Sequence, residues 1–202
     1  MLLSQKLSNY KVILASQSPR RRELLAGAGI DFVLAENYHI DEVYPPELDS
    51  IRVPEFLAGL KSQAFPRPLM PDEILITADT VVICGNSILG KPRDRDNAIS
   101  MLEMLSGRTH TVVTGVVLRS AGRQTQFSSS SEVRFRQLSH DEIIHYVDTY
   151  KPFDKAGSYG IQEWIGYVAI ESINGSFYNV MGLPVQSLYV ELDRFIDALP
   201  NR

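Results

Sequence analysis

The strongest constraint on the fold is the run "ILITADTVVIC", Ile74–Cys84, which is rich in β-branched and apolar residues. Such a run predicts a central β-strand. Asp79 interrupts it, and a carboxylate inside an apolar strand must lose its hydration, which is costly unless the group is paired or binds a metal ion. Asp79 is therefore either a functional residue or a residue at a strand end that bonds to a neighbouring loop. Thr80 follows it and would point to the opposite face of a regular strand.

The rest of the chain alternates between strand and helix patterns. Strands are expected over residues 11–15, 31–35, 110–120 and 125–138, and helices over residues 19–27, 54–64, 94–106, 139–150 and 183–199. Residues 150–166 form an expected glycine-rich loop, and residues 167–182 an expected hairpin that turns at Asn174–Gly175. The mix of buried strands and interspersed helices predicts an α/β fold with a large mixed sheet. No internal repeat or linker divides residues 1–202, which are expected to form a single domain.

The composition limits the classes of function. The chain has a net charge of −4, which argues against a nucleic-acid partner, so any other anionic partner must meet a local basic cluster. Its single cysteine, Cys84, excludes an intramolecular disulfide and a cysteine-cluster zinc site. The four histidines lack metal-ligand spacing and are expected at the surface. The sequence shows no secretion signal and no apolar run of about 18 residues, so a cytoplasmic enzyme with no membrane partner is the expected class.

A basic cluster follows the first expected strand. The stretch "ILASQSPRRRELLAGAG" places a Ser-x-Ser-Pro turn and three arginines where a strand is followed by a helix. Ser18 suits the N-cap of that helix, and Pro19 suits its first turn. Free N–H groups and the positive end of the helix dipole make such a junction an anion site, and a phosphate there would offset the unfavourable placement of Arg20 and Arg21 in the first turn. The alternative is a solvated basic patch.

Two further segments carry weaker signals. In "LGKPRD", Lys91 stands before a proline and so lies in extended backbone. In "DKAGSYGIQ", Asp154–Gln162, two glycines allow a close approach of the backbone to another group. Lysines before proline and glycine loops are common, and Lys61 in isolation reads as a surface charge on a helix. None of these residues predicts a function by itself.

Taken together and in this order, these segments resemble the Maf family of nucleoside triphosphate pyrophosphatases. The matching segments are "LASQSPRRRELL", "ADTVV", "GKPRD", "LSGRTHTVVTGV", "DKAGSYGIQ" and "INGSFYNVMGLP", which run from residue 14 to about residue 184. The segment "DKAGSYGIQ" looks like the subgroup that hydrolyses dTTP and UTP, whereas the sister subgroup acts on 7-methyl-GTP. After Gln162 the chain departs from the family pattern, because it reads "EWIG" where many members have a Gly-x-Gly run.

The resemblance implies a role for individual residues. It implies substrate binding by Ser18, Arg20, Arg21, Lys61, Thr80, Lys155 and Gln162, catalysis by Asp79, Glu42 and Lys91, and metal binding by Asp79 and Glu42. Gln162 and Thr80 match the positions that set base preference. A carboxamide complements the N–H donor and carbonyl acceptor of uracil or thymine, and when flipped it complements cytosine as well.

The implied reaction is attack of water on the α-phosphorus of a nucleoside triphosphate, which gives the monophosphate and pyrophosphate. A divalent cation, Mg²⁺ or Mn²⁺, would assist, because carboxylate and phosphate oxygens are hard ligands. Asp79 then either deprotonates water or holds the metal. The family fold implies an elongated mixed sheet flanked by helices, with two lobes around a deep central cleft, and a homodimer. Two alternatives remain, which are the same reaction on modified purine triphosphates and a non-catalytic nucleotide-binding regulator of septum formation.

Overall fold

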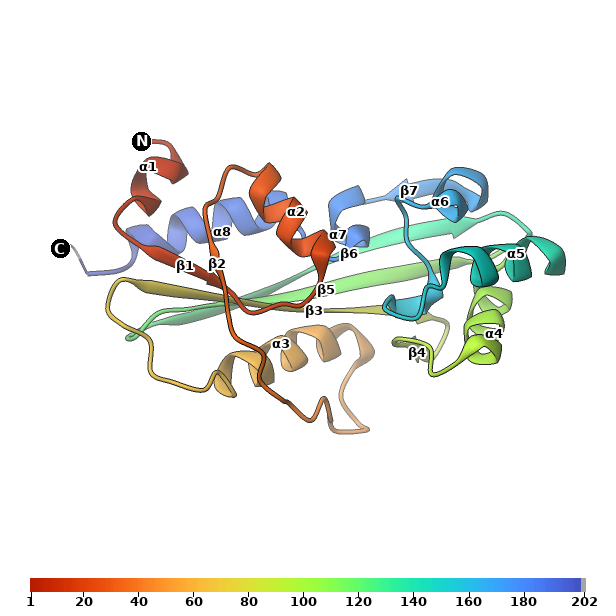
Figure 1. Ribbon diagram of the computed structural model, residues 1–202, viewed down its shortest axis with the longest axis horizontal. Helices are drawn as coiled ribbons and strands as arrows, with labels where there is room; N and C mark the ends of the chain where they lie inside the picture. Colours follow the sequence, from red (N-terminus) through yellow and green to blue (C-terminus); the bar gives the residue numbers. More distant parts are fainter. Residues whose placement is uncertain (201–202) are drawn as a thin grey trace. The chain divides into compact units, whose positions relative to one another are not determined.

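The computed structural model describes residues 1–200 as a chain of alternating helices and strands (Figure 1). The strands are β1 (Lys11–Leu14), β2 (Val33–Leu34), β3 (Glu73–Cys84), β4 (Ser87–Leu89), β5 (Thr109–Arg119), β6 (Gln124–Phe135) and β7 (Ile170–Asn174). The α-helices are α1 (Leu3–Leu7), α2 (Pro19–Gly27), α3 (Val53–Gln63), α4 (Arg95–Leu105), α5 (His140–Tyr150), α6 (Trp164–Ala169), α7 (Phe177–Met181) and α8 (Val185–Asp197). Single 3₁₀ turns are η1 (Ser50–Arg52) and η2 (Ala156–Ser158).

The strands form one seven-stranded mixed sheet, which confirms the predicted α/β class. The strand order is β2-β1-β3-β5-β6-β7, with β4 paired to β3 outside this path. Strand β1 pairs in parallel with both β2 and β3, whereas the β3–β4 and β6–β7 pairs are antiparallel. Among the described helices, none combines the length and hydrophobicity that a bilayer-spanning helix needs.

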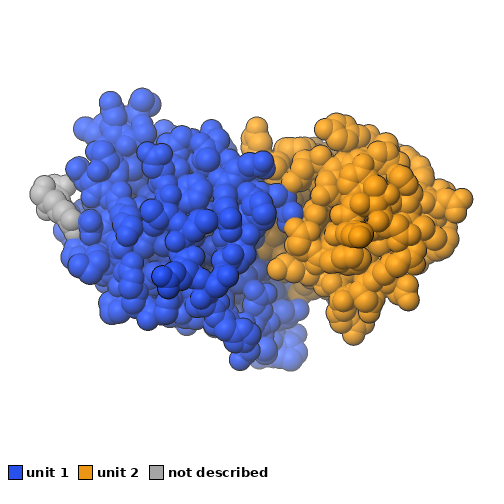
Figure 2. Space-filling view, viewed as in Figure 1, with its two compact units in different colours: residues 1–79, 114–129, 182–202 blue, residues 80–113, 130–181 orange. Residues whose placement is uncertain are grey.

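The chain divides into two compact units, coloured separately in Figure 2. Unit 1 comprises residues 1–79, 114–129 and the chain from residue 182 onward, and unit 2 comprises residues 80–113 and 130–181. The boundary in β3 falls between Asp79 and Thr80, so these adjacent site candidates belong to different units. The single domain with two lobes around a cleft stays a prediction.

In unit 1, helix α3 packs against β5 at unusually close range. A Cβ atom added at Gly115 would lie 2.2 Å from the backbone nitrogen of Glu55 and 2.5 Å from the carbonyl carbon of Pro54. On β3, the hydroxyl of Thr77 donates to the carbonyl oxygen of Ala58 over 2.8 Å. The glycine and the threonine together fix the position of α3, which carries Lys61.

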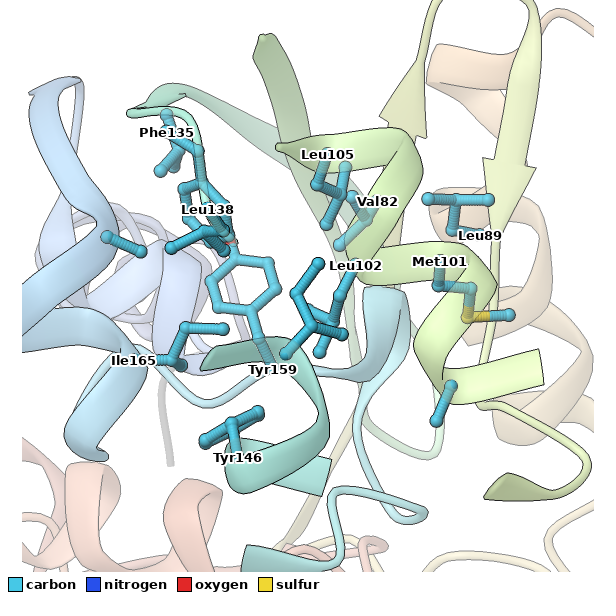
Figure 3. Packing of buried hydrophobic residues seen from close by; sticks show 14 of the residues in the cluster. Val82, Leu89, Met101, Leu102, Leu105, Phe135, Leu138, Tyr146, Tyr159 and Ile165 are labelled. Atoms are coloured by element: carbon cyan, nitrogen blue, oxygen red, sulfur yellow. The ribbon is translucent and has the colours of Figure 1, made fainter. Parts of the chain in front are cut away.

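Unit 2 is built around a large apolar cluster shared by α4, α5 and the sheet (Figure 3). Phe135 and Tyr146 are completely buried in it, and Tyr159 is nearly so. Contrary to the surface position expected for the histidines, His110 is 2% exposed, and its Nε2 lies 2.8 Å from the Tyr159 hydroxyl. Burial lowers the pKa of His110 to about 4, so the ring is neutral at physiological pH and packs as an aromatic residue against Phe135 and Tyr159.

Two expectations for the region after residue 150 were wrong. Helix α6 begins within the expected glycine-rich loop and ends within the expected hairpin, whose remaining residues form β7 followed by helix α7. Tertiary contacts account for α7. The buried side chain of Asn179 on α7 donates to the carbonyl of Val112 (3.1 Å) and to the Ser131 hydroxyl (3.0 Å). These bonds hold the segment after Gly175 as a helix instead of a returning strand.

The close approach of α3 to β5 predicts a large effect of Gly115→Ala. The added methyl group meets backbone atoms, which cannot move aside as a flexible side chain can. We expect a loss of about 3 kcal/mol in the free energy of unfolding, measured by urea denaturation. Gly59→Ala on α3 is the matched control, because nothing lies within 4 Å of its added Cβ. The control should be neutral or stabilising by up to about 1 kcal/mol, and equal effects of the two variants would contradict the close packing.

Candidate active site

Lys61 joins the two predicted acidic residues of unit 1. Its Nζ lies 2.9 Å from Oε1 of Glu42 and forms a short ion pair with Oδ1 of Asp79. The side chains of Lys61 and Asp79 are 14% and 11% exposed, whereas that of Glu42 is 52% exposed. The structure thus brings three of the predicted site residues together. Lys61 thus forms ion pairs with one carboxylate that water reaches, that of Glu42, and with one that is almost removed from water, that of Asp79.

Three different segments position this ion-pair cluster. Asp79 comes from β3 and Lys61 from the last turn of α3, whose carbonyl at Lys61 accepts a hydrogen bond of 2.8 Å from the Tyr38 hydroxyl. Glu42 comes from the segment between β2 and η1, which has no regular secondary structure. The placement of α3 against β5 therefore decides whether Lys61 can reach both carboxylates.

The surroundings of Asp79 favour its neutral form more than water does. Burial raises the pKa of the Asp79 carboxyl above its ordinary value, and the positive charges of Lys61 and Arg21 oppose that shift. A carboxylate in this setting is a stronger base than one in water, because desolvation disfavours its charged form. The same setting makes Lys61 the partner on which the charged form of Asp79 depends.

Arg21 is a second cation near Asp79. Its Nε donates to the carbonyl of Gly182 over 2.7 Å, and its Nη1 donates to the carbonyl of Ala78 over 2.8 Å and to the Ser16 hydroxyl over 3.4 Å. Burial lowers the pKa of the Arg21 guanidinium, and the negative charge of Asp79 opposes that change. A guanidinium stays charged in proteins. Arg21 on α2 therefore holds a fixed positive charge at the carbonyl of Ala78, which is the residue before Asp79 on β3.

The start of α2 agrees with the sequence prediction except at its cap. Pro19 begins the helix and Ser18 stands at the N-cap position, but the Ser18 side chain makes no capping hydrogen bond. The Ser18 backbone nitrogen instead donates to the Ser16 hydroxyl over 3.3 Å. The Ser18 hydroxyl is therefore not committed to the helix, and Arg20 lies in the first helical turn, where the peptide N–H groups point outward.

Unit 2 holds the four remaining predicted residues. Thr80 lies on β3, and Lys91 lies exposed in the loop between β4 and α4. The backbone nitrogen of Gly157 donates to the carbonyl of Gly90 over 3.0 Å, which fastens the loop of Lys91 to the segment that contains the other two residues. The roles assigned to these residues stay predictions.

Lys155 and Gln162 stand at the two ends of the glycine-containing segment. Lys155 is 7% exposed, and its Nζ lies 2.7 Å from Oδ1 of Asp154 and 3.0 Å from Oε1 of Glu163. Oε1 of Gln162 is buried without a hydrogen-bond partner among the described residues. A cavity of about 230 Å³ lies beside Gln162, and its wall includes Tyr167, Ile170, Ile173 and Phe177.

Sequence reasoning missed two residues that organise this segment. Glu163 bonds to both Lys155 and Tyr146, and Tyr146 also accepts a hydrogen bond from Gly160. The departure "EWIG" after Gln162 was the one available signal for Glu163. Tyr146 carried no signal, because an aromatic residue on the apolar face of a helix is typical of a core.

Comparison with known proteins gives consistent matches along nearly the whole chain. Residues 11–195 match the family model described as Maf-like protein. A dTTP/UTP pyrophosphatase of Parabacteroides distasonis is 51% identical over 191 residues, which cover 95% of this chain and 99% of the relative. A protein of the same name from Porphyromonas gingivalis is 55% identical over 191 residues, which cover 94% and 96%. Among solved structures, a HAM1 protein from Coxiella burnetii aligns with a TM-score of 0.48 and 14% identity over 92% of this chain and 99% of that chain.

The chain belongs to the Maf family, as the family model and the sequence identities show. The resemblance inferred from the motifs is thereby confirmed. The relatives named above also carry the subgroup name that the segment "DKAGSYGIQ" indicates.

The ion-pair cluster predicts a pH-dependent stability effect for Lys61→Met. Methionine keeps most of the apolar stem but leaves the Asp79 carboxylate without its partner, which should cost about 3 kcal/mol at pH 7. Without Lys61 the folded-state pKa of Asp79 rises further, so the deficit should shrink as the pH falls through that raised pKa and Asp79 takes up a proton. Urea denaturation at pH 7 and pH 5 measures both values.

The double variant Lys61→Met/Asp79→Asn is the control for this effect. It removes the unpaired charge, so its stability deficit should be smaller than that of Lys61→Met and independent of pH over the same range. A pH-independent deficit in the single variant would contradict the pairing.

Proposed function

We propose that this protein is a nucleoside triphosphate pyrophosphatase that hydrolyses dTTP and UTP to the monophosphate and pyrophosphate. The observation that carries the proposal is the cluster of Glu42, Lys61 and Asp79, in a chain about half identical to relatives named dTTP/UTP pyrophosphatase. A triphosphate carries about four negative charges, which cations must offset before a nucleophile can approach. Lys61 and Arg21 provide two cations for this purpose, and the carboxylates of Asp79 and Glu42 provide groups suited to a base or a metal ion.

The proposed chemical step is attack of water on the α-phosphorus. Asp79 accepts a proton from the water, and its raised pKa brings the carboxyl closer to the pH at which a general base is most effective. The water oxygen bonds to the α-phosphorus as the bond from that phosphorus to its bridging oxygen breaks. Pyrophosphate leaves with the bridging oxygen, while Lys61 and Arg21 offset the phosphate charge.

A divalent cation, Mg²⁺ or Mn²⁺, completes the proposal. Among residues 1–200, no group of three His, Cys, Asp or Glu side chains is placed to hold a metal ion. The carboxylate of Glu42, joined by that of Asp79 if Asp79 holds the metal instead of deprotonating water, nevertheless suits Mg²⁺, which proteins commonly bind through one or two carboxylates together with substrate phosphates. When bound, the ion would neutralise charge on the phosphates.

The remaining expectations belong to the same proposal. The exposed aromatic residues Tyr167, Phe177 and Tyr178 of unit 2 offer apolar surface that a second copy of the chain would cover in a homodimer. A cytoplasmic location agrees with a free and buried Cys84 and with a nucleotide substrate. Arg20 and Ser18 would bind phosphate oxygens at the start of α2, where peptide N–H groups favour anions.

Pyrophosphate release from a panel of nucleotides tests the proposal. With purified protein and Mg²⁺ or Mn²⁺, we expect dTTP and UTP to be hydrolysed faster than 7-methyl-GTP and ITP, and chelation with EDTA to abolish the reaction. Asp79→Asn keeps the shape of the side chain and removes the base, so its kcat should fall at least about a hundredfold with folding intact. If the wild-type protein prefers 7-methyl-GTP or ITP, the result would favour the same reaction on modified purine triphosphates. Nucleotide binding without turnover would favour a non-catalytic regulator.

Gln162→Ala tests the reading of the base. If the carboxamide bonds to the N3–H and O4 edge of thymine or uracil, kcat/KM for dTTP and UTP should fall about tenfold to a thousandfold, whereas slow purine substrates change far less. The buried, unbonded Oε1 of Gln162 supports this role, because a donor on the base would offset its lost hydration. Equal losses for all nucleotides would assign Gln162 to the phosphates or the metal instead.

A further inference from the structure

Glu163 makes two contacts that no part of the proposed chemistry uses. It stands directly after Gln162, at the N-cap of α6. Its Oε1 lies 3.0 Å from Nζ of Lys155, and its Oε2 accepts a short hydrogen bond from the Tyr146 hydroxyl. The carboxylate thereby connects the first residue of segment 155–162 with helix α5.

Tyr146 links Glu163 to the backbone of segment 155–162. Its hydroxyl oxygen accepts a hydrogen bond of 3.0 Å from the backbone nitrogen of Gly160 while donating to Glu163. The Tyr146 side chain is completely buried, and it belongs to the unit 2 cluster drawn in Figure 3. Burial raises the pKa of Tyr146, and the bond to Glu163 adds to the rise, so the hydroxyl keeps the proton that it donates.

The space around Gly160 is filled by the same two side chains. A Cβ atom added at Gly160 would lie 2.8 Å from Cδ of Glu163 and 2.9 Å from Cε of Lys155. A Cβ atom added at Gly166 on α6 would lie 1.7 Å from the carbonyl oxygen of Ile161. The segment is therefore seated tightly against both α6 and the Glu163 side chain, immediately before Gln162.

Lys155 depends on Glu163 for its charge balance. Its ammonium group is almost fully buried and lies between the carboxylates of Asp154 and Glu163. A buried ammonium group is costly unless carboxylates or other acceptors surround it. Asp154 is largely exposed, with a side chain 56% accessible, whereas that of Glu163 is 22% accessible. Glu163 is thus the less solvated of the two partners.

We propose that Glu163 is a positioning residue for base selection, because its carboxylate fastens Lys155, Tyr146 and thereby Gly160 into one conformation of the segment that ends at Gln162. This inference rests on the proposed hydrolysis of pyrimidine triphosphates. Glu163 acts on the orientation of its neighbour Gln162 and takes no part in the attack on phosphorus. Loss of the carboxylate should therefore reduce selectivity between bases more than it reduces the chemical step.

Three variants in unit 2 test the inference. Glu163→Gln keeps the shape and removes the charge, Glu163→Ala removes both contacts, and Tyr146→Phe removes only the hydroxyl that joins Glu163 to Gly160. Glu171→Gln is the matched control, because Glu171 pairs with Arg134 at 3.2 Å on the exposed surface of the same unit. The measured quantities are the kcat/KM values for dTTP and dCTP, the ratio of the Kd values for the same nucleotides, and the hydrogen-exchange rate of the Gly160 amide.

In Glu163→Gln and Tyr146→Phe we expect the dTTP-to-dCTP ratio of kcat/KM to fall about tenfold, mainly through KM for dTTP, with Glu163→Ala falling further. Exchange at the Gly160 amide should quicken about tenfold, because its hydrogen bond is weakened or lost. The Glu171→Gln control should change neither quantity. Tyr146→Phe keeps the buried ring, so it provides the test if Glu163→Ala fails to fold.

Separate outcomes overturn the inference and the proposed function. The role of Glu163 is overturned if the wild-type protein releases pyrophosphate from dTTP and all three variants keep its dTTP-to-dCTP ratio of kcat/KM within about twofold. A fall in melting temperature with an unchanged base ratio would do the same, since it shows a contribution to stability alone. A wild-type protein that hydrolyses neither dTTP nor UTP overturns the proposed function instead, and the Kd ratio then decides whether Glu163 governs base selection in binding.

Discussion

The contact of Lys61 with both Asp79 and Glu42 is the interaction on which the candidate active site depends. Two carboxylates at short range repel one another, and burial of Asp79 makes its charge more costly still. One ammonium group between them offsets both effects. Lys61 can occupy that position only because α3 lies directly against β5 at Gly115, where no side chain separates the two backbones. In unit 1, the backbone packing of α3 on β5 therefore determines the electrostatics of the site through the position of Lys61.

The two units bear on different parts of the proposed reaction. Unit 1 contains Asp79, Glu42, Lys61 and Arg21, which are four of the charged groups suited to phosphate and water, whereas the predicted Lys91 belongs to unit 2. Unit 2 contains Gln162 and the network of Glu163, Tyr146 and Lys155 that seats the segment before it. Loss of a charge in unit 1 should act on the rate, whereas loss of a contact in the unit 2 network should act on the choice of base.

The sequence was sufficient for the long elements and for the family, but not for contacts between distant residues. The β-branched run around Asp79 predicted β3, and the helix expected over residues 139–150 corresponds to α5. Helices α6 and α7 have six and five residues, and helices this short depend on tertiary contacts such as those of Asn179. The pairing of Lys61 was equally hidden, because a lone lysine on a helix has the same local pattern whether it is solvated or paired.

The central claim is that Asp79, with its charge balanced by Lys61, activates water for attack on the α-phosphorus. The most direct test is a single turnover of dTTP in H₂¹⁸O, with both products analysed by mass spectrometry. The account predicts one ¹⁸O atom in the phosphate of dTMP and none in pyrophosphate. Label in pyrophosphate with unlabelled dTMP would show attack at the β-phosphorus, and absence of label from both products after the first turnover would show a protein nucleophile in place of water. Either result would contradict the account.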